Sequence, residues 1–464
     1  MKNIILHELQ QFIYGLRLPI ALAIVLLMFA ASAITYISEY KENVKAYREL
    51  TDNQEKELRK RADNATQVAI KNREYQLPPR NNGFISDCGE LNMPNTFVYT
   101  AFNRLLLWSN ISKDNPLIMP SSRISWGFVL VALFSFLAII FSFDAVSGEK
   151  ESRTLALCLS HPVKRSHILL GKFVAINLLL AVFAVVGVLV ALAILMLSPS
   201  VSITGETFSE IGLFLLFVVF FMGSMSAVGL FASVMCSSSS ISLLTSVSLW
   251  LVFLIAVPNF AGTVGMAALP VEKINVMQAK MEAKRVEIEN SITYPSKWSS
   301  NGSDPFYPPH EIRATMQMAF DKNEGDFWGE RYAAQFRQTE TMRRWTWISP
   351  LAVFEYGMEA LLDGGYARLR RNYGDLQSFK IQYLQWFKDI DMKDDKSPHW
   401  YNPKEDYSMT RKPVAYEDIP QFVESPTSIA ERLAETLKYL MVMLAYMGVM
   451  FTLAIGRFNR YDVR

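Results

Sequence analysis

The chain has 464 residues, 51% of them hydrophobic, and a formal net charge of only +2. Without a strongly basic segment it gives no indication of a nucleic-acid partner. Its apolar residues are gathered in long runs almost free of charge, and a bilayer core about 30 Å thick needs roughly 20 such residues in a helix. The composition argues against a soluble multidomain protein and predicts an integral membrane protein.

The first apolar run covers residues 18–37, and a signal peptide is its alternative interpretation. Lys2 precedes the run, and Ala31-Ser32-Ala33 imitates a cleavage site. The run is longer than the apolar region of a signal peptide, which has about 7–15 residues. We therefore interpret it as an uncleaved first transmembrane helix.

Further apolar runs occupy 126–143, 173–197, 211–235, 241–264 and 439–455. Pro258 lies in the fifth span and should kink or end it near its outer end, because proline removes a backbone donor. The sequence thus predicts an all-α integral membrane protein with six transmembrane helices.

Lysine and arginine are concentrated on one side of these spans. They are Lys2, Arg17, Lys150, Arg153, Lys164, Arg165, Lys172, Arg457, Arg460 and Arg464, whereas 198–210 contains neither residue type. The positive-inside rule then places both termini and the 144–172 loop in the cytoplasm. Segments 38–125 and 265–438 are expected to lie outside, since long loops translocate largely regardless of charge.

The two outer segments are predicted to fold into a mainly helical extracytoplasmic domain. Residues 40–73 and 273–292 carry apolar stripes at helical spacing, so we expect helices that prolong the first and fifth spans and pack together. A solvated linker is the alternative. Residues 294–309 predict a loop, and the aromatic-rich 327–387 region has enough apolar side chains for a small core.

The predicted organisation therefore has five parts. They are 1–37 (N-terminal helix and first span), 38–125 (first insertion), 126–264 (spans two to five with the 144–172 loop), 265–438 (second insertion) and 439–464 (sixth span and tail).

Motifs for catalysis are missing. A phosphate loop G-x-x-x-x-G-K-[ST] is absent, since Phe173 follows Gly171-Lys172 and Ser166 stands where the first glycine should be. Cys88, Cys158 and Cys236 have no metal-ligand spacing and form no disulfide framework. We expect no catalytic residue, metal site or cofactor in this chain, and Cys88 to be an ordinary buried residue.

The interiors of the six spans contain no Asp, Glu, Lys, Arg or His. Ion-coupled carriers usually bind their coupling ion through such groups, so an autonomous channel or carrier is disfavoured. Asn177 and the serine and threonine groups of the fourth and fifth spans are expected to hydrogen-bond between helices. The driving force should therefore act from outside the bilayer.

The most specific stretch is the charged 144–172 loop. It contains Asp144, Gly148-Glu149-Lys150-Glu151, Arg153-Thr154-Leu155, Pro162-Val163-Lys164-Arg165 and Gly171-Lys172-Phe173. Residues 154–159 predict a short helix on the membrane, closed by Pro162, which could press into a groove of a soluble partner. A positive-inside anchor without further role is the alternative.

This loop resembles the motif after the second helix of ABC-2-type permeases, the membrane subunits of ABC exporters. The resemblance implies a coupling element facing a separate ATP-binding subunit, formed by Asp144, Gly148, Glu149, Lys150, Glu151, Arg153, Thr154 and Leu155, and closed by Pro162, Arg165, Gly171 and Lys172. Glu149 and Arg153 would make the charge-assisted contacts. ATP and Mg²⁺ would bind the partner, and a second copy or a sibling permease would complete the unit in a bacterial cytoplasmic (inner) membrane.

Two further stretches resemble a subgroup with an enlarged outer domain. They are 348–350 ahead of Phe354 and the closing 457–464. The two large insertions suggest an alternative function, a mechanotransmitter or membrane anchor in which a cytoplasmic ATPase drives the outer domain against an envelope partner without transport.

The N-terminal residues form an apolar stripe at helical spacing beside Glu8. The stripe consists of Ile4, Ile5, Leu9, Phe12, Ile13 and Leu16. Such a helix suits the inner membrane interface, like the connecting helix of this family. An inward extension of the first span is the alternative.

Overall fold

The computed structural model describes residues 2–102, 105–108, 124–159, 164–292, 310–425 and 427–461. Six helices in this part are long and apolar enough to cross a membrane. They are α2 (Arg17–Arg61), Trp126–Glu151 (with α4 Trp126–Val129, α5 Ser135–Ser142 and α6 Ser147–Glu151), α8 (Arg165–Met196), α9 (Gly205–Met235), Ser239–Ala268 (with α10 Ser239–Leu251 and α11 Val257–Ala268) and α16 (Ile429–Asn459). The prediction of an all-α membrane protein with six spans is confirmed.

The other elements are shorter or more polar. The helices are α1 (Lys2–Tyr14), α3 (Ala65–Ile70), α7 (Leu155–Leu159), α12 (Ile274–Ser291), α13 (His310–Trp345), α14 (Pro350–Leu361) and α15 (Gly365–Asp391). The strands β1 (Arg73–Gln76), β2 (Thr96–Tyr99) and β3 (Leu105–Trp108) form an antiparallel sheet in that order. The sequence patterns did not predict it, because four residues are too few for a clear alternation.

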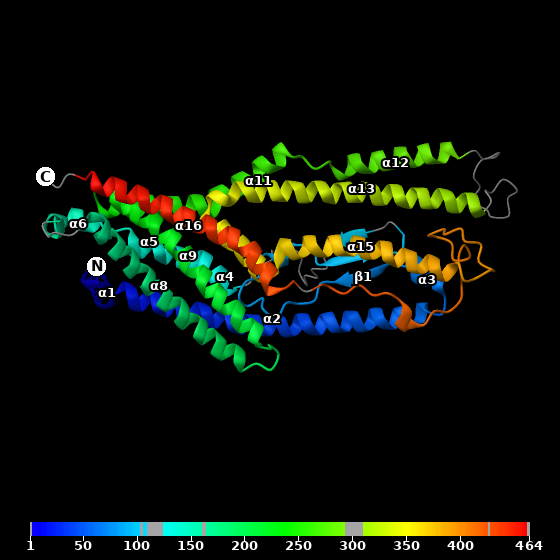
Figure 1. Cartoon of the computed structure of the whole chain (residues 1–464), viewed down its shortest axis with the longest axis horizontal. Helices are drawn as coiled ribbons and strands as arrows, with labels where there is room; N and C mark the ends of the chain where they lie inside the picture. Colours follow the sequence, from blue (N-terminus) through cyan, green and yellow to red (C-terminus); the bar gives the residue numbers. More distant parts are fainter. Residues whose placement is uncertain are drawn as a thin grey trace.

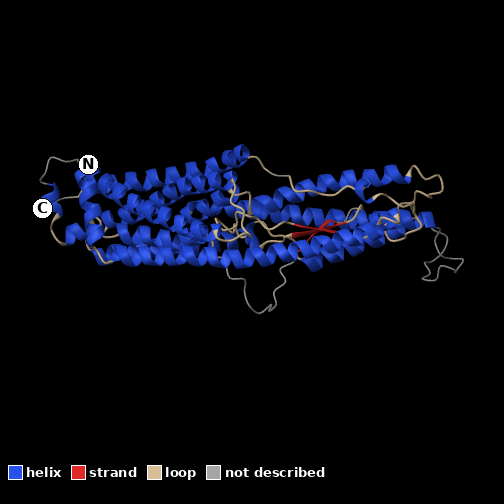
Figure 2. Ribbon diagram, turned by 90° about the horizontal axis from the view of Figure 1, so that it is seen from below, coloured by secondary structure: helices blue, strands red, loops and turns tan. Residues whose placement is uncertain are grey.

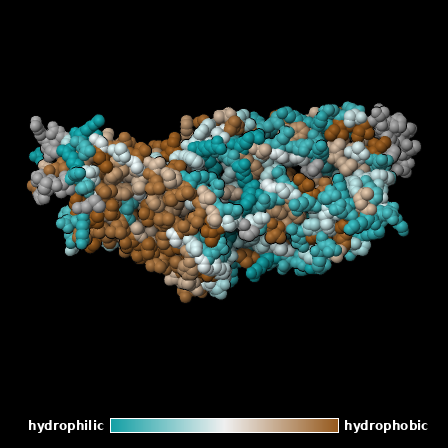
Figure 3. All heavy atoms as spheres, viewed as in Figure 1, coloured by the Kyte–Doolittle hydropathy of each residue, from teal (hydrophilic) through white to brown (hydrophobic). Residues whose placement is uncertain are grey.

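The molecule is elongated and has two unlike halves (Figure 1). At one end lies the helical bundle, made of the six long helices, and both chain termini lie at its free end. At the other end lies the distal domain, which contains the outer part of α2, α3, the sheet, α12, α13 and α15; helices dominate both halves (Figure 2). The surface changes accordingly from hydrophobic over the bundle to mostly hydrophilic over the distal domain (Figure 3).

Each half has its own core. In the bundle, Phe29, Trp126 and Phe214 are fully buried. In the distal domain, Phe97 of β2 and Phe387 of α15 are fully buried among other aromatic residues. Burial of one such side chain contributes about 1.5–3 kcal/mol. The predicted core of the aromatic-rich 327–387 region is therefore present.

The distal helices differ in part from the prediction. Helix α2 does prolong the first span, running unbroken to Arg61, and Asn64 then caps α3 by accepting a hydrogen bond from Thr66 N (3.0 Å). The fifth span ends at Ala268, and α12 starts afresh beyond Pro270. Helix α12 packs on α13 through its buried Met277 and lies on the opposite side of the distal domain from α2 (Figure 1), so the predicted pairing of the two prolonged helices is wrong.

Pro258 does not end the fifth span. The helix continues through it to Ala268, and the segment just before it, Val252–Ala256, is π-helical. A π turn just before proline accommodates the missing backbone donor without breaking the helix. The predicted loop at 294–309 lies outside the described residues.

Polar side chains join the long helices to one another. Asn177 of α8 donates to Ser226 Oγ of α9 (2.9 Å), and Ser242 of α10 donates to the Phe143 carbonyl (2.6 Å). Ser224 of α9 also donates to the Met443 carbonyl of α16 (3.2 Å). The predicted interhelical role of these groups is confirmed.

Lys380 of α15 supplies a pH-dependent prediction. Burial lowers the pKa of this lysine to about 8. Below pH 8 the folded protein must bury a charge, and between pH 8 and about 10.4 the unfolded chain binds more protons, so stability rises with pH there. Lys380→Met should raise the free energy of unfolding at pH 7 by about 1–3 kcal/mol, and the gain should fade near pH 10.

Thermal unfolding of the full chain in mild detergent at pH 7 and pH 10 tests this expectation. Lys322→Met, at an exposed position of α13, is the matched control and should be near neutral. An equal gain from both variants, or a gain at pH 10 as large as at pH 7, would contradict the burial argument.

Candidate coupling site at the free end of the bundle

The charged segment between the second and third spans, here called the coupling segment (144–172), lies at the free end of the bundle near both termini (Figure 1). Helix α6 continues the second span, and α7 agrees with the short helix expected at 154–159. Pro162 lies outside the described residues.

A buried lysine joins three helices at this end. Lys172, near the start of α8, is 3% exposed, and its Nζ donates to Glu8 Oε1 of α1 (2.6 Å) and Glu149 Oε1 of α6 (2.7 Å). Buried charges are costly unless they are paired, so this trio, here called the lysine clamp, holds α1, α6 and α8 in one arrangement.

The lysine clamp is not fully satisfied. It contains two carboxylates for one ammonium group, and Glu149 Oε2 is buried with no hydrogen-bond partner among the described residues. Sequence analysis expected Glu149 to face a partner, whereas its Oε1 is held inside the chain. In the structure, one oxygen of Glu149 is therefore bonded to Lys172 and the other, Oε2, is left without a donor among the described residues.

Gly171 allows α1 to approach α8 closely. A Cβ at this position would lie 2.8 Å from Ile4 Cγ2, which is too close for a side chain. Helix α1 is separated from α2 by a turn at Gly15, so it is not a simple inward extension of the first span. Its apolar side also contacts the second span, where Phe12 and Phe141 meet edge to face at 5.4 Å.

Two residues of α6 fasten the coupling segment to the fourth and fifth spans. Lys150 Nζ donates to the carbonyls of Val234 (2.5 Å) and Cys236 (2.9 Å), which the last turn of α9 leaves unpaired. Glu151 Oε2 accepts from Ser239 N (3.0 Å) and so caps α10, with a negative charge at the helix N-terminus.

Two other charged residues attach neighbouring helices. Arg165 Nη1 donates to the Phe458, Asn459 and Tyr461 carbonyls at the end of α16, at 2.9, 3.1 and 2.8 Å. Asp144 accepts from Arg17 Nη1 at 2.7 Å, at the start of α2. The charges of the motif are therefore largely used to bind helix ends within the chain.

The turn between α6 and α7 faces outward. Arg153 and Thr154 are exposed, and Arg153 adopts a left-handed backbone conformation with φ of 59°. Leu155 is 2% exposed and anchors α7, while Gly148 lies under the turn, where a Cβ would be 3.6 Å from Ser239 Oγ. Of the predicted residues described, Arg153 and Thr154 are thus the best placed to touch another protein.

The bond between Glu8 and Lys172 was not predicted from the sequence. Its signal was an acidic residue at helical spacing beside the apolar stripe of α1, which suggests a buried charge. The carbonyls of Val234 and Phe458 carry no side-chain signal at all. The described residues contain no group of three or more His, Cys, Asp or Glu side chains that could hold a metal ion.

These features define a helical membrane protein whose charged segment between spans two and three is bound to the ends of neighbouring helices. The family model for ABC-2 family transporter proteins matches residues 2–463, and the chain belongs to this family. The six apolar helices that are long enough to cross a membrane agree with this membership.

Two curated relatives share part of the sequence. The probable ABC transporter permease protein NosY of Pseudomonas aeruginosa is 38% identical over 84 residues, which are 18% of this chain and 30% of that protein. The protein of the same name from Stutzerimonas stutzeri is 36% identical over 99 residues, 21% of this chain and 36% of that protein. The chain thus covers about a third of the length of these relatives.

Proposed function

We propose that this chain is the permease subunit of an ATP-driven exporter and that its coupling segment receives movement from a separate ATP-binding subunit. The observation that carries the proposal is the set of side-chain bonds from this segment to the middle of α1 and to the ends of α2, α9, α10 and α16. If α6 moved, these bonds would therefore move several spans at the same time.

The movement would be a rigid-body switch. A partner that binds two arrangements of the coupling segment with different affinities in its two nucleotide states can shift the helices between two packings. ATP and Mg²⁺ would remain in the partner, and this chain would supply no catalytic group. Arg153 and Thr154 would touch the partner, while Glu149 would act inside the chain through its bond to Lys172.

A second permease copy or a sibling permease would complete the membrane unit. Only 17% of the most apolar window is buried in the fifth span and in the sixth, against 72% in the second and 67% in the fourth. The fifth and sixth spans thus keep faces for lipid or for another permease. We infer a bacterial cytoplasmic membrane, with both termini in the cytoplasm and the distal domain outside.

Arg153→Glu should abolish co-purification of the ATP-binding subunit, since it reverses the charge of an exposed side chain in the proposed contact. The test is a pull-down of the tagged chain from its native host in mild detergent, with mass spectrometry and an ATPase assay. Arg460→Glu, an exposed arginine at the same end of the bundle, is the control and should retain the subunit. Retention by both variants would remove Arg153 from the contact.

Mechanical transmission without transport is the second candidate. Helix α2 runs without a break from the bundle into the distal domain, and 45 residues at about 1.5 Å per residue give a rod roughly 67 Å long. Spin labels on both halves would distinguish the candidates in the reconstituted complex. ATP-driven movement of the distal domain with no substrate-stimulated ATPase activity would favour transmission over export.

A further inference from the structure

An apolar crevice opens on the bundle where α9 and α16 approach the distal domain. Its volume is about 240 Å³, and it is lined by Leu213, Leu216, Phe217, Leu361, Leu433, Ala434, Thr436, Leu437 and Leu440. The only polar side chain in this lining, Thr436, donates its hydroxyl to the Arg432 carbonyl at 2.7 Å, so it needs no other partner. The crevice therefore offers a purely apolar surface to a ligand.

Two charged chambers lie directly beyond this crevice, with volumes of about 580 and 640 Å³. Both are lined by Asp363, Arg371, Thr427 and Arg432. A narrow gap lined by Glu210, Leu213 and Arg432, among others, joins the crevice to this level. These neighbouring hollows, here called the recess, have an apolar end on the bundle and a charged end at the distal domain, and the gap between the two ends holds only about 10 Å³.

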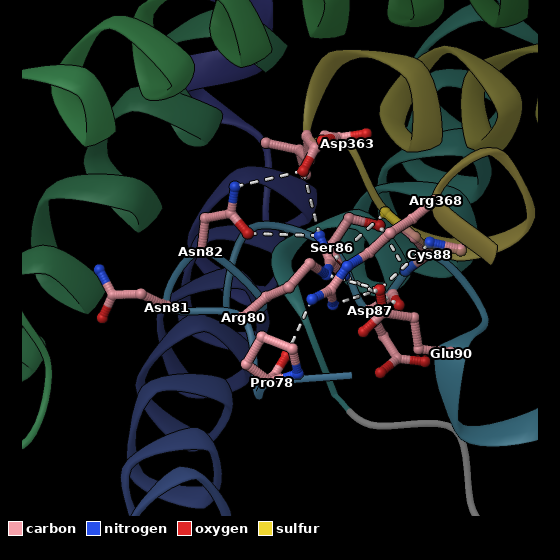
Figure 4. Close-up of polar contacts among 12 residues, drawn as sticks. Pro78, Arg80, Asn81, Asn82, Ser86, Asp87, Cys88, Glu90, Asp363 and Arg368 are labelled. Carbon is pink, nitrogen blue, oxygen red and sulfur yellow. Dashed lines mark hydrogen bonds and ion pairs between the residues drawn. The ribbon is translucent and has the colours of Figure 1, made fainter. Parts of the chain in front are cut away.

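The charged end is balanced in sign. The smaller chamber is lined by Arg80, Arg368, Arg371 and Arg432 and by Glu206, Glu210, Asp363 and Glu424. Figure 4 shows Arg80 and Arg368 of this chamber side by side. Equal numbers of cationic and anionic groups favour a zwitterion over a simple anion or cation.

Arg432 stands where the two ends of the recess meet. Its side chain is 8% exposed, and its Nη1 donates to Glu210 Oε1 at 2.6 Å while Nη2 pairs with Glu206. Its Nε is buried and makes no hydrogen bond in the part of the chain that the structure describes; the same holds for Arg371 Nε. Buried donors of this kind normally have a partner.

Aromatic residues indicate at which depth of the membrane the recess lies. Trp347, Tyr356 and Tyr439 line the larger chamber, with ring centroids of Trp347 and Tyr439 6.0 Å apart. Tryptophan and tyrosine concentrate at the headgroup level of membranes. The charged end therefore lies at the membrane surface, and the apolar crevice lies beneath it along the acyl chains.

We propose that this recess binds one zwitterionic phospholipid of the adjacent leaflet, with an acyl chain in the crevice between α9 and α16. The phosphate would lie against Arg371 and Arg432, which line both charged chambers, and the ammonium group would pair with Glu206, whose side chain is 57% exposed. This site does not depend on the coupling to an ATP-binding subunit. It is a lipid-binding site in its own right.

Native mass spectrometry of the full chain released from nanodiscs of phosphatidylethanolamine and phosphatidylglycerol tests the site. Ala434→Trp puts an indole into the crevice and should reduce retained lipid at least about tenfold, the loss of roughly two buried methylene groups. Ala445→Trp, an exposed position of α16 outside the crevice, is the matched control and should retain lipid like the parent protein.

Glu206→Gln tests the headgroup without filling the crevice. It should keep the bound phospholipid but abolish the preference for phosphatidylethanolamine over phosphatidylglycerol. Equal retention by Ala434→Trp and Ala445→Trp would overturn the site. So would equal retention of the two phospholipids by the parent protein, or retention of detergent alone.

Discussion

Replacing Lys172 with methionine should lower the free energy of unfolding by about 3–5 kcal/mol and abolish assembly with the proposed ATP-binding subunit. The variant keeps the apolar stem but leaves the buried Glu8 and the partly buried Glu149 without the ammonium group that both contact. Helix α1 and the coupling segment would then separate. Thermal unfolding of the purified chain and co-purification of the partner measure the two effects.

A charge-free version of the lysine clamp provides the decisive control. Glu8→Gln, Glu149→Gln and Lys172→Met together remove all three charges at similar volume, and they should recover most of the lost stability, because no unpaired charge remains buried. Lys164→Met, an exposed lysine at the same end of the bundle, should change stability by less than about 0.5 kcal/mol. If Lys172→Met behaved like Lys164→Met, the lysine clamp would have no structural role.

Replacing Arg80 with methionine should lower the free energy of unfolding by about 3–5 kcal/mol and loosen the distal domain where it meets the bundle. The guanidinium donates to the Ser86 and Asp87 carbonyls at 3.0 and 3.2 Å and pairs with Glu90 at 2.8 Å (Figure 4). Burial opposes the charge, but Glu90 raises the pKa of Arg80 above its usual value. The variant would leave the partly buried carboxylate of Glu90 and two backbone carbonyls without their main donor.

Hydrogen exchange measures this loosening, and the segment from Arg80 to Glu90 should lose protection while the long helices keep theirs. Arg411→Met is the matched control, since Arg411 is exposed and its pair with Asp406 (3.0 Å) should contribute only about 0.2–1 kcal/mol. Unchanged protection at Arg80→Met would show that Glu90 is satisfied by Arg368 alone.

The buried thiol of Cys88 lies in the same region. The residue is 7% exposed, as expected for an ordinary buried cysteine, and burial raises its pKa to about 12. Its backbone is left-handed (φ of 53°), and so is that of Gly89 (φ of 72°), which precedes a short 3-10 helix at Glu90–Asn92. Gly89 is the usual signal for such a backbone, whereas Cys88 carries none, because a left-handed residue other than glycine is uncommon.

Features of local origin were predictable. Runs of roughly 20 apolar residues form helices that can cross a membrane whatever their neighbours are, so the number of spans followed from the sequence. The short helix at Leu155–Leu159 and the charged coupling segment were also identified from their own residues. The aromatic core of the distal domain followed from composition, since so many large side chains need burial.

Only the tertiary structure decided which distant residues meet. The partners Glu8 and Lys172 are 164 positions apart, and the pairing of α12 with α13 depends on which stripe of each amphipathic helix finds a complementary surface. The backbone carbonyls that receive Lys150 and Arg165 have no identity in the sequence. Local patterns determine which segments are helical and apolar, whereas the choice among many possible long-range contacts is made by packing the whole chain at once.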